Sequence, residues 1–291
     1  MVNCPPLKMT TMKFEVSATL AYEAVGSSSL LLTIQPFPSK EQTILSESFL
    51  TTPALTMQEL FSPSNEKRVK VLEVAEAGTF TIHYTGKVAN EIKEIPGEEL
   101  ADVFIPLMPA SVLPYLNPSR YCQSDKLYKF AFNKFGAMEH AFDKVNAICD
   151  WIHRNIEYSA GFSTSQTSAF DTITEQVGVC RDFAHLGVAL CRALTIPARY
   201  FSGYAYKLNP PDFHACFEAY LGGHWIIFDA TRLVPLNGLV KVATGLDAAE
   251  TAIASSFGNL NLQTIEVKIT SLDADFQPIS PTVSSHGYSY S

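Results

Sequence analysis

The sequence predicts an α+β protein in which an antiparallel β-domain precedes a core of helices and strands. In residues 12–95, apolar side chains recur at every second position, which is typical of half-buried strands. After residue 119 the apolar spacing changes to three and four, which is typical of amphipathic helices. Strands return from residue 198 onward. This order favours two domains, and the length of 291 residues accommodates both.

Composition narrows the function classes that the chain can serve. Hydrophobic residues make up 47% of the chain, enough for ordinary buried cores. The formal charge is −8 at pH 7 and no Lys/Arg block occurs, so we expect no nucleic-acid partner. Pro, Ser or a charge interrupts every apolar run, so we expect no membrane partner. The first residues carry no apolar secretion signal, and we expect a cytoplasmic protein with reduced cysteines.

The N-terminal β-rich domain is predicted over residues 1–110. Its clearest strand is KFEVSATL, and the other runs read as strands are SLLLTIQ, TILSESFL, KRVKVLEV and FTIHYTGKV. Clusters of Pro, Gly, Ser and Asn separate them, and only the short TMQELF segment has helical periodicity. Short strands joined by turns favour an antiparallel sandwich. Five prolines in residues 96–119 indicate a connector between the domains.

The second domain is predicted over residues 111–275. Helices are expected at about 125–135, with Ser124 as the cap, and at about 138–155. Two more helical stretches are TSAFDTITEQ and GVCRDFAHLGVALCRAL, and the second ends before a proline. The strands that follow are ARYFSGYAY, HACFEAYL, HWIIFDATR and NLQTIEVKIT. Residues 276–291, rich in Ser and Pro, are expected to form a loosely ordered tail.

A predicted hairpin places a histidine beside a carboxylate. HACFEAYL and HWIIFDAT flank Gly222-Gly223, a strong turn dipeptide. With these glycines as the loop, His214 and Asp229 are diagonal neighbours on the same face of the hairpin. The opposite face is nearly all apolar and can pack on a helix. A carboxylate in this position holds one imidazole nitrogen and leaves the other facing a substrate.

The candidate nucleophile is Cys180, which follows Gly178-Val179 and opens an amphipathic helix. The helix dipole and the free N–H groups at a helix start favour a thiolate over a thiol. A nearby imidazole completes an activated thiolate–imidazolium pair. Backbone N–H groups at the same helix start can stabilise an oxyanion. The sequence therefore predicts nucleophilic catalysis by Cys180, with His214 as the acid–base group and Asp229 orienting it.

Other readings of the chemistry-bearing residues are weaker. His185 is off the face of Cys180 and is expected to pack or cap. Cys149 and His153 have the spacing of two metal ligands but lack further partners. Neither a CxxC pair nor an HExxH motif is present, which argues against a zinc ribbon and a metal-dependent hydrolase. We therefore expect no metal or organic cofactor. The remaining cysteines are expected to be small buried hydrophobes: Cys4, Cys122, Cys149, Cys191 and Cys216.

Four stretches resemble the transglutaminase-like superfamily, in its bacterial cysteine-protease branch with an N-terminal β-domain. They are PYLNPSRYCQSD, TITEQVGVCRDFAHLGVALCRALTIPARYFSGYAY, DFHACFEAYLGGHWIIFDATR and VATGLDAAETAIASSFGN, within about residues 114–262. The resemblance implies a papain-like α+β core with a triad in the chain order Cys180, His214, Asp229. These are the same residues that helix start and hairpin geometry select.

The sequence departs from the family pattern at two positions beside the triad. Cys216 stands where the family usually has tryptophan, and Ala230 stands where it usually has proline. Both changes affect the shape of the pocket more than its chemistry, and Cys216 is expected to be a wall residue. Animal transglutaminases also place an upstream tryptophan at the oxyanion site. Trp151 does not match it, because it lies near the end of a helix and is expected to pack.

The reaction expected from these residues is cysteine-dependent acyl transfer from an amide or peptide bond, to water or to an amine. The partner is therefore a peptide or protein amide substrate. The alternative is a non-catalytic module on the same fold that binds peptides or cell-wall fragments. Selective labelling of Cys180 by a thiol probe separates the two. Substrate identity, the acyl acceptor and the oligomeric state stay open at this point.

Overall fold

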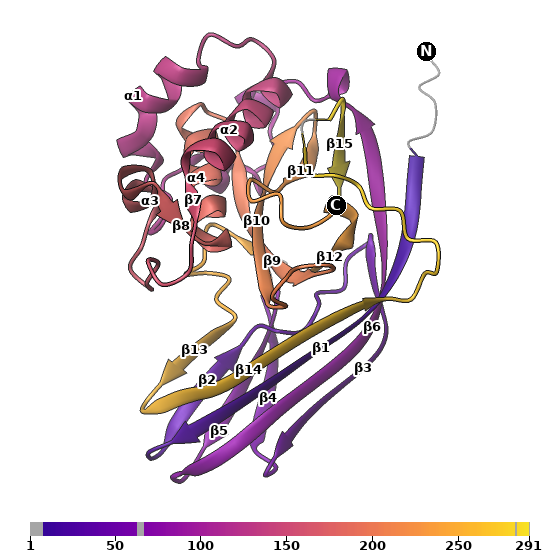
Figure 1. Cartoon of the computed structure of the whole chain (residues 1–291), viewed down its shortest axis with the longest axis vertical. Coiled ribbons are helices and arrows are strands. Elements are labelled where there is room, and N and C mark those ends of the chain that lie inside the picture. Colours follow the sequence, from indigo (N-terminus) through magenta and orange to yellow (C-terminus); the bar gives the residue numbers. More distant parts are fainter. Residues whose placement is uncertain (1–7, 63–66, 283, 291) are drawn as a thin grey trace.

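The structure of the chain is a computed structural model that describes residues 8–62, 67–282 and 284–290 (Figure 1). Figure 1 shows long strands extending at one end of the molecule and the helices grouped at the other. The predicted α+β class is confirmed, with the first helix after a run of six strands. Among the described residues, no helix is both long enough and apolar enough to cross a membrane.

The N-terminal region is an antiparallel β-sandwich, as predicted. Its strands are β1 (Lys8–Ala24), β2 (Ser28–Leu32), β3 (Gln42–Thr52), β4 (Thr56–Phe61), β5 (Arg68–Val74) and β6 (Gly78–Pro96). One sheet pairs β1 with β6 and β3 with β6, and the other has β2 and β5 side by side, flanked by β4. Alternate residues of β1 are buried, and they share one apolar core with residues of β2 and β5. The alternation of apolar residues in the sequence thus identifies the residues of β1 that form the core of the sandwich.

The prediction of helical character for TMQELF is wrong. This segment is β4, and it pairs with β5 from Thr56 opposite Glu73 to Phe61 opposite Arg68. A six-residue segment gains few intrahelical hydrogen bonds and cannot offset the cost of helix nucleation. Pairing with β5 instead gives the backbone N–H and C=O groups of this segment hydrogen-bond partners in the neighbouring strand.

Helices and short 3-10 turns lead into the second region. The turns are η1 (Gly97–Glu99), η2 (Ile105–Leu107) and η3 (Leu113–Leu116), and they occupy the proline-rich connector. The helices are α1 (Ser124–Phe135), α2 (Ala141–Asn155), α3 (Ala169–Glu175) and α4 (Cys180–Ala193). All four coincide with predicted helical stretches. The most buried is α4, in which every residue from Asp182 to Ala193 is buried.

The central sheet positions the site. Its strands are β9 (Ala198–Ala205), β10 (Phe213–Leu221), β11 (His224–Phe228) and β12 (Leu239–Gly245), in the antiparallel order β11-β10-β9-β12. A two-strand parallel bridge, β7 (Glu157–Tyr158) with β8 (Val177–Gly178), lies before α4. The predicted hairpin register is confirmed, since Leu221 pairs with His224. Phe217 and Phe228 of the apolar face join the helical core.

The C-terminal segment returns to the sandwich. After η4 (Leu236–Gly238), β13 (Ala254–Phe257) pairs with β2, β14 (Leu260–Ser271) with β1, and β15 (His286–Ser289) with β6. The predicted strand NLQTIEVKIT is β14. The prediction of a loosely ordered tail from residue 276 is wrong for its last residues, because Tyr288 of β15 and Tyr290, which follows the strand, are buried. The Tyr290 hydroxyl donates to the Leu236 carbonyl at 2.7 Å, an anchor that a composition rich in Ser and Pro does not reveal.

Candidate active site

Cys180 is the first residue of α4, as the sequence predicts. The carboxylate of Asp182 turns back and accepts the backbone N–H of Val179 at 2.9 Å, which closes the entry to the helix. Gly178 makes this approach possible, because a Cβ there would lie 2.7 Å from the Asp182 Cβ. The helix start is thus fixed tightly in place. Its first-turn N–H groups and positive dipole end lie at the thiol.

Exposure separates Cys180 from the other thiols that the structure describes. Cys180 is half-buried, whereas the other four described cysteines are buried. Burial raises the pKa of each of these four: Cys122, Cys149, Cys191 and Cys216. They are therefore protonated at neutral pH and inert as nucleophiles. Cys4 lies outside the described residues.

His214 and Asp229 form a buried pair. The two side chains are fully buried, and His214 Nε2 lies 3.0 Å from Asp229 Oδ2. The second carboxylate oxygen, Asp229 Oδ1, accepts the backbone N–H of Thr231 at 2.9 Å and its hydroxyl at 2.7 Å. The carboxylate is therefore locked in orientation and fixes the imidazole in turn. The diagonal contact predicted from the hairpin is present.

The electrostatics of this pair favour a charged imidazole. Burial alone lowers the pKa of His214, but the negative charge and hydrogen bond of Asp229, together with Cys180, raise it to about 10. The other ring nitrogen, Nδ1, has no partner with full hydrogen-bond geometry among the described residues, and the Cys180 side chain acts on the imidazole only as a weaker hydrogen-bonding group. Cys180 and His214 nevertheless line the same pocket. The structure thus brings all three predicted residues together, with one imidazole nitrogen held and the other available.

The stability of the fold should depend on pH through His214. Because its folded pKa is raised from 6.5 to about 10, its stabilising contribution is complete below about pH 6.5 and is lost as pH rises through about 10. The free energy of unfolding of the wild type minus that of His214→Asn should therefore fall across this window, by an amount on the order of a few kcal/mol. Urea unfolding of both proteins at several pH values measures it. A difference independent of pH would contradict the buried ion pair.

Tyr158 is a site residue that the sequence did not indicate. The β7–β8 bridge sets Tyr158 opposite Gly178, two residues before Cys180, and its ring packs against Phe183 with centroids 5.6 Å apart. Its hydroxyl interacts with both the side chain and the backbone N–H of Cys180. Burial and then the charge at Cys180 raise the pKa of Tyr158 to about 12, so the hydroxyl stays a donor at neutral pH. A two-residue bridge leaves no periodic signal in the sequence.

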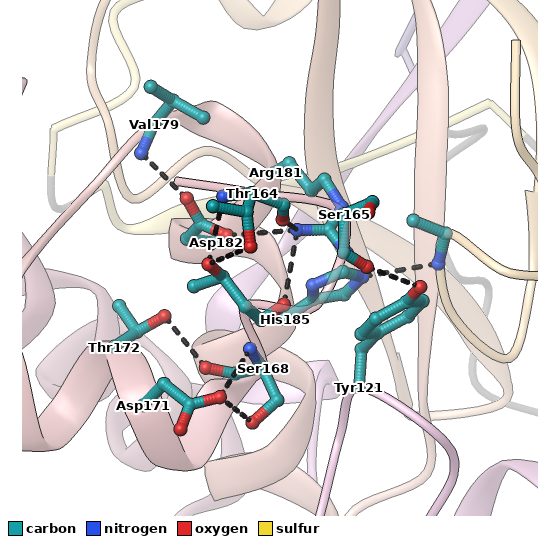
Figure 2. Close-up of polar contacts among 12 residues, drawn as sticks. Tyr121, Thr164, Ser165, Ser168, Asp171, Thr172, Val179, Arg181, Asp182 and His185 are labelled. Carbon is teal, nitrogen blue, oxygen red and sulfur yellow. Dashed lines mark hydrogen bonds and ion pairs between the residues drawn. The ribbon is translucent and has the colours of Figure 1, made fainter. Parts of the chain in front are cut away.

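A polar network holds the loop before α3 against the start of α4 (Figure 2). Arg181 Nη1 donates to the carbonyls of Thr164 and Thr167 at 3.2 and 3.1 Å, and to Asp182 at 3.2 Å. The hydroxyl of Tyr121 donates to the Ser165 carbonyl at 2.8 Å. Figure 2 shows these groups converging around the first turn of α4. The loop therefore forms a fixed border of the site.

His185 packs, as expected, and is not part of the group formed by Cys180, His214 and Asp229. Its ring is fully buried and stacks on Tyr121 at 5.1 Å, with Tyr200 at 4.9 Å. His185 Nε2 accepts the backbone N–H of Ala248 at 3.1 Å (Figure 2). Burial lowers the pKa of His185 well below 6.5, so the ring is neutral. Trp151 also packs, edge-on against Phe130 at 4.9 Å.

Comparison with known proteins assigns the family. Residues 12–111 match the bacterial transglutaminase N-terminal domain, and residues 129–230 match the core of the transglutaminase-like superfamily. A crystal structure from Cytophaga hutchinsonii, described as a "putative cysteine protease", is 50% identical with a TM-score of 0.95, covering 98% of this chain and 100% of that one. The chain belongs to the transglutaminase-like superfamily. Membership supports a cysteine-dependent activity at the level of the family.

A more distant relative from the same comparisons is mycobacterial. An uncharacterized protein of Mycobacterium leprae is 32% identical over 141 residues. The match covers 44% of this chain and 50% of that protein, so it spans half of the relative's length.

The two departures from the superfamily pattern lie beside the group formed by Cys180, His214 and Asp229. Cys216 is buried and joins the apolar core shared with the sandwich. Ala230 is buried in the helical core next to Asp229. Neither residue lines the pocket that contains Cys180. Cys216 is therefore a packing residue, and not the pocket wall that the sequence suggested.

Proposed function

We propose that this member of the transglutaminase-like superfamily is an acyl-transfer enzyme that attacks amide or peptide carbonyls with Cys180. The observation that carries the proposal is the imidazole of His214, held by Asp229 at 3.0 Å and open at its other nitrogen beside the one half-buried thiol among the described cysteines. The buried ring of His185 also has an unpaired nitrogen, so the features that single out His214 are the carboxylate that holds it, its raised pKa and its place in the pocket that Cys180 lines.

The mechanism follows from the charge state of the pair. With its pKa raised to about 10, His214 is an imidazolium at neutral pH, and in the proposed mechanism Cys180 reacts beside it as the thiolate. The thiolate sulfur attacks the carbonyl carbon, and the carbonyl π electrons move to oxygen. The backbone N–H of Cys180 at the start of α4 stabilises this oxyanion. His214 then gives its proton to the departing amine as the C–N bond breaks, which leaves a thioester on Cys180.

The second half-reaction regenerates the enzyme. Water or an amine attacks the thioester while neutral His214 removes its proton. The C–S bond breaks, the thiolate leaves, and the imidazolium is restored by the proton taken from the acceptor. Water as acceptor gives hydrolysis, and an amine gives transamidation. Product analysis with and without an added primary amine distinguishes the two outcomes.

Tyr158 is expected to strengthen oxyanion binding. Its hydroxyl is close enough to Cys180 for the side chain and backbone N–H of that residue to act on its pKa, and in the proposed mechanism the substrate oxyanion forms beside Cys180. Tyr158→Phe keeps the ring that packs on Phe183 but removes the donor. We expect kcat to fall about a hundredfold with little change in KM, because the donor acts mainly in the transition state. Steady-state kinetics measures this. An unchanged kcat would remove Tyr158 from the mechanism.

A reactivity assay tests the proposed function against a binding module on the same fold. The native enzyme is treated with limiting iodoacetamide, and the modified cysteines are identified by peptide mass mapping. We expect Cys180 to react first. A peptide amide substrate should slow its labelling, because the substrate occupies the thiol. Labelling of Cys180 no faster than that of the buried thiols would favour the binding module.

A further inference from the structure

A pocket of about 380 Å³ opens beside Cys180 and His214. It lies between α4, β9, β10 and the segment that leads into β13. Its size is at the lower end of the range for small-ligand sites, so one or two side chains of a substrate can fill it. Aromatic rings from Tyr121, Tyr200 and Phe213 form part of its wall, and alanines from two segments keep the remainder open.

Together with His214 and Thr251, Ser202 is one of the buried polar residues that line this pocket. It lies on β9, is only 4% exposed, and lines the pocket. Its hydroxyl is buried and has no hydrogen-bond partner among the described residues. Buried hydroxyls are normally paired, because leaving one unpaired costs free energy. Ser165 is the second serine among the described residues that line the pocket, and it is exposed at the rim.

The charge of the pocket restricts what can enter. No Asp or Glu is among the described residues that line it, so a lysine or arginine side chain would find no counter-charge. The one arginine in the wall, Arg181, is already paired with Asp182 and two backbone carbonyls. A carboxylate would have to compete with these partners. The lining therefore suits a neutral side chain with an aromatic body and one polar atom at its far end.

We propose that this pocket is a substrate subsite for a tyrosine side chain of the acyl-donor peptide, with its phenolic hydroxyl bonded to Ser202. The ring packs among Tyr121, Tyr200 and Phe213, and the phenol reaches the unpaired serine. This inference rests on the proposed function, since it takes Cys180 as the point of acylation. A site built around a buried hydroxyl rejects a ligand that lacks the matching group, because the hydroxyl is then left unpaired.

The test uses peptidyl chloromethyl ketones that differ by one hydroxyl, tyrosine against phenylalanine. One series carries the aromatic residue at the ketone and another carries it one residue earlier. Attack by the Cys180 sulfur forms a thioether and releases chloride, and intact-mass spectrometry gives the rate. In at least one series we expect the tyrosine reagent to react about tenfold faster.

Matched variants identify the hydroxyl of Ser202 as the cause. Ser202→Val and Ser202→Thr have the same shape, and only threonine keeps a hydroxyl. The preference for tyrosine should disappear in Ser202→Val and persist in Ser202→Thr. Equal rates for the two reagents in the wild type, in both series, would overturn the subsite whether or not the variants fold.

The same experiment separates this inference from the proposed function. Labelling of Cys180 at equal rates overturns the subsite and leaves the acyl-transfer proposal standing. No labelling of Cys180 by any reagent contradicts the acyl-transfer proposal instead. The subsite is then judged by calorimetry with N-acetyl-tyrosinamide and N-acetyl-phenylalaninamide on the wild type and both Ser202 variants. A tyrosine preference that depends on the hydroxyl supports the subsite, and equal affinities overturn it.

Discussion

Cys180→Ser is expected to lower amide turnover by about 10⁴-fold or more. The serine hydroxyl keeps the size and polarity of the side chain, but it does not form an anion beside the imidazolium of His214. The position at the start of α4 is unchanged, so the fold should be preserved. Steady-state turnover of a peptide amide and far-UV circular dichroism measure the two effects together.

Cys216→Ser is the matched control for this loss. Cys216 is on the same strand as His214, but it is buried in the apolar core, and burial raises its pKa well above 9.0. Serine at this position is expected to cost some stability, because it buries a hydroxyl, while turnover changes by no more than about threefold. An equal loss of acylation in the Cys216 and Cys180 variants would contradict the choice of nucleophile.

Asp229→Asn should lower kcat by about 10³-fold or more while leaving the fold intact. The amide oxygen can still accept from Thr231, but the negative charge that raises the pKa of His214 is gone. His214 is then neutral at pH 7 and can adopt the wrong tautomer. Its proton is no longer available to the leaving amine.

The pH profile distinguishes an electrostatic role of Asp229 from a purely structural one. In the wild type, the activity that requires protonated His214 should persist until pH rises through about 10, because the imidazolium is retained below that value. In Asp229→Asn the alkaline limb should move to lower pH. A reduced kcat with an unmoved alkaline limb would mean that Asp229 only holds the hairpin in shape.

Local patterns were sufficient to predict the core of the site. The dipeptide Gly222-Gly223 fixes the register of β10 and β11, and that register fixes the contact between His214 and Asp229. Helical periodicity after Gly178 likewise locates Cys180 at the start of α4. Both features depend on residues close together in the sequence, where turn chemistry and side-chain period decide the structure.

Features that depend on distant segments were not predictable in the same way. Tyr158 reaches Cys180 through a bridge of two residues, which is too short to produce a period. Ser202 is one of eight consecutive buried residues in β9, so alternation does not reveal which face holds a pocket. The strand β15 pairs with β6 across nearly two hundred residues, and its Ser-rich composition indicates a loop. The positions of Tyr158, Ser202 and β15 all depend on packing against segments that are distant in the sequence.

The central claim is that Cys180 carries the acyl group, and a trapped acyl-enzyme tests it most directly. The wild type is mixed with an activated peptide ester, quenched in acid within its first turnover, and mapped by peptide mass spectrometry. We predict one thioester adduct, located on Cys180, released by hydroxylamine and absent from Cys180→Ser. An adduct on any other residue, or turnover of the ester with no covalent adduct in the wild type, would contradict the claim.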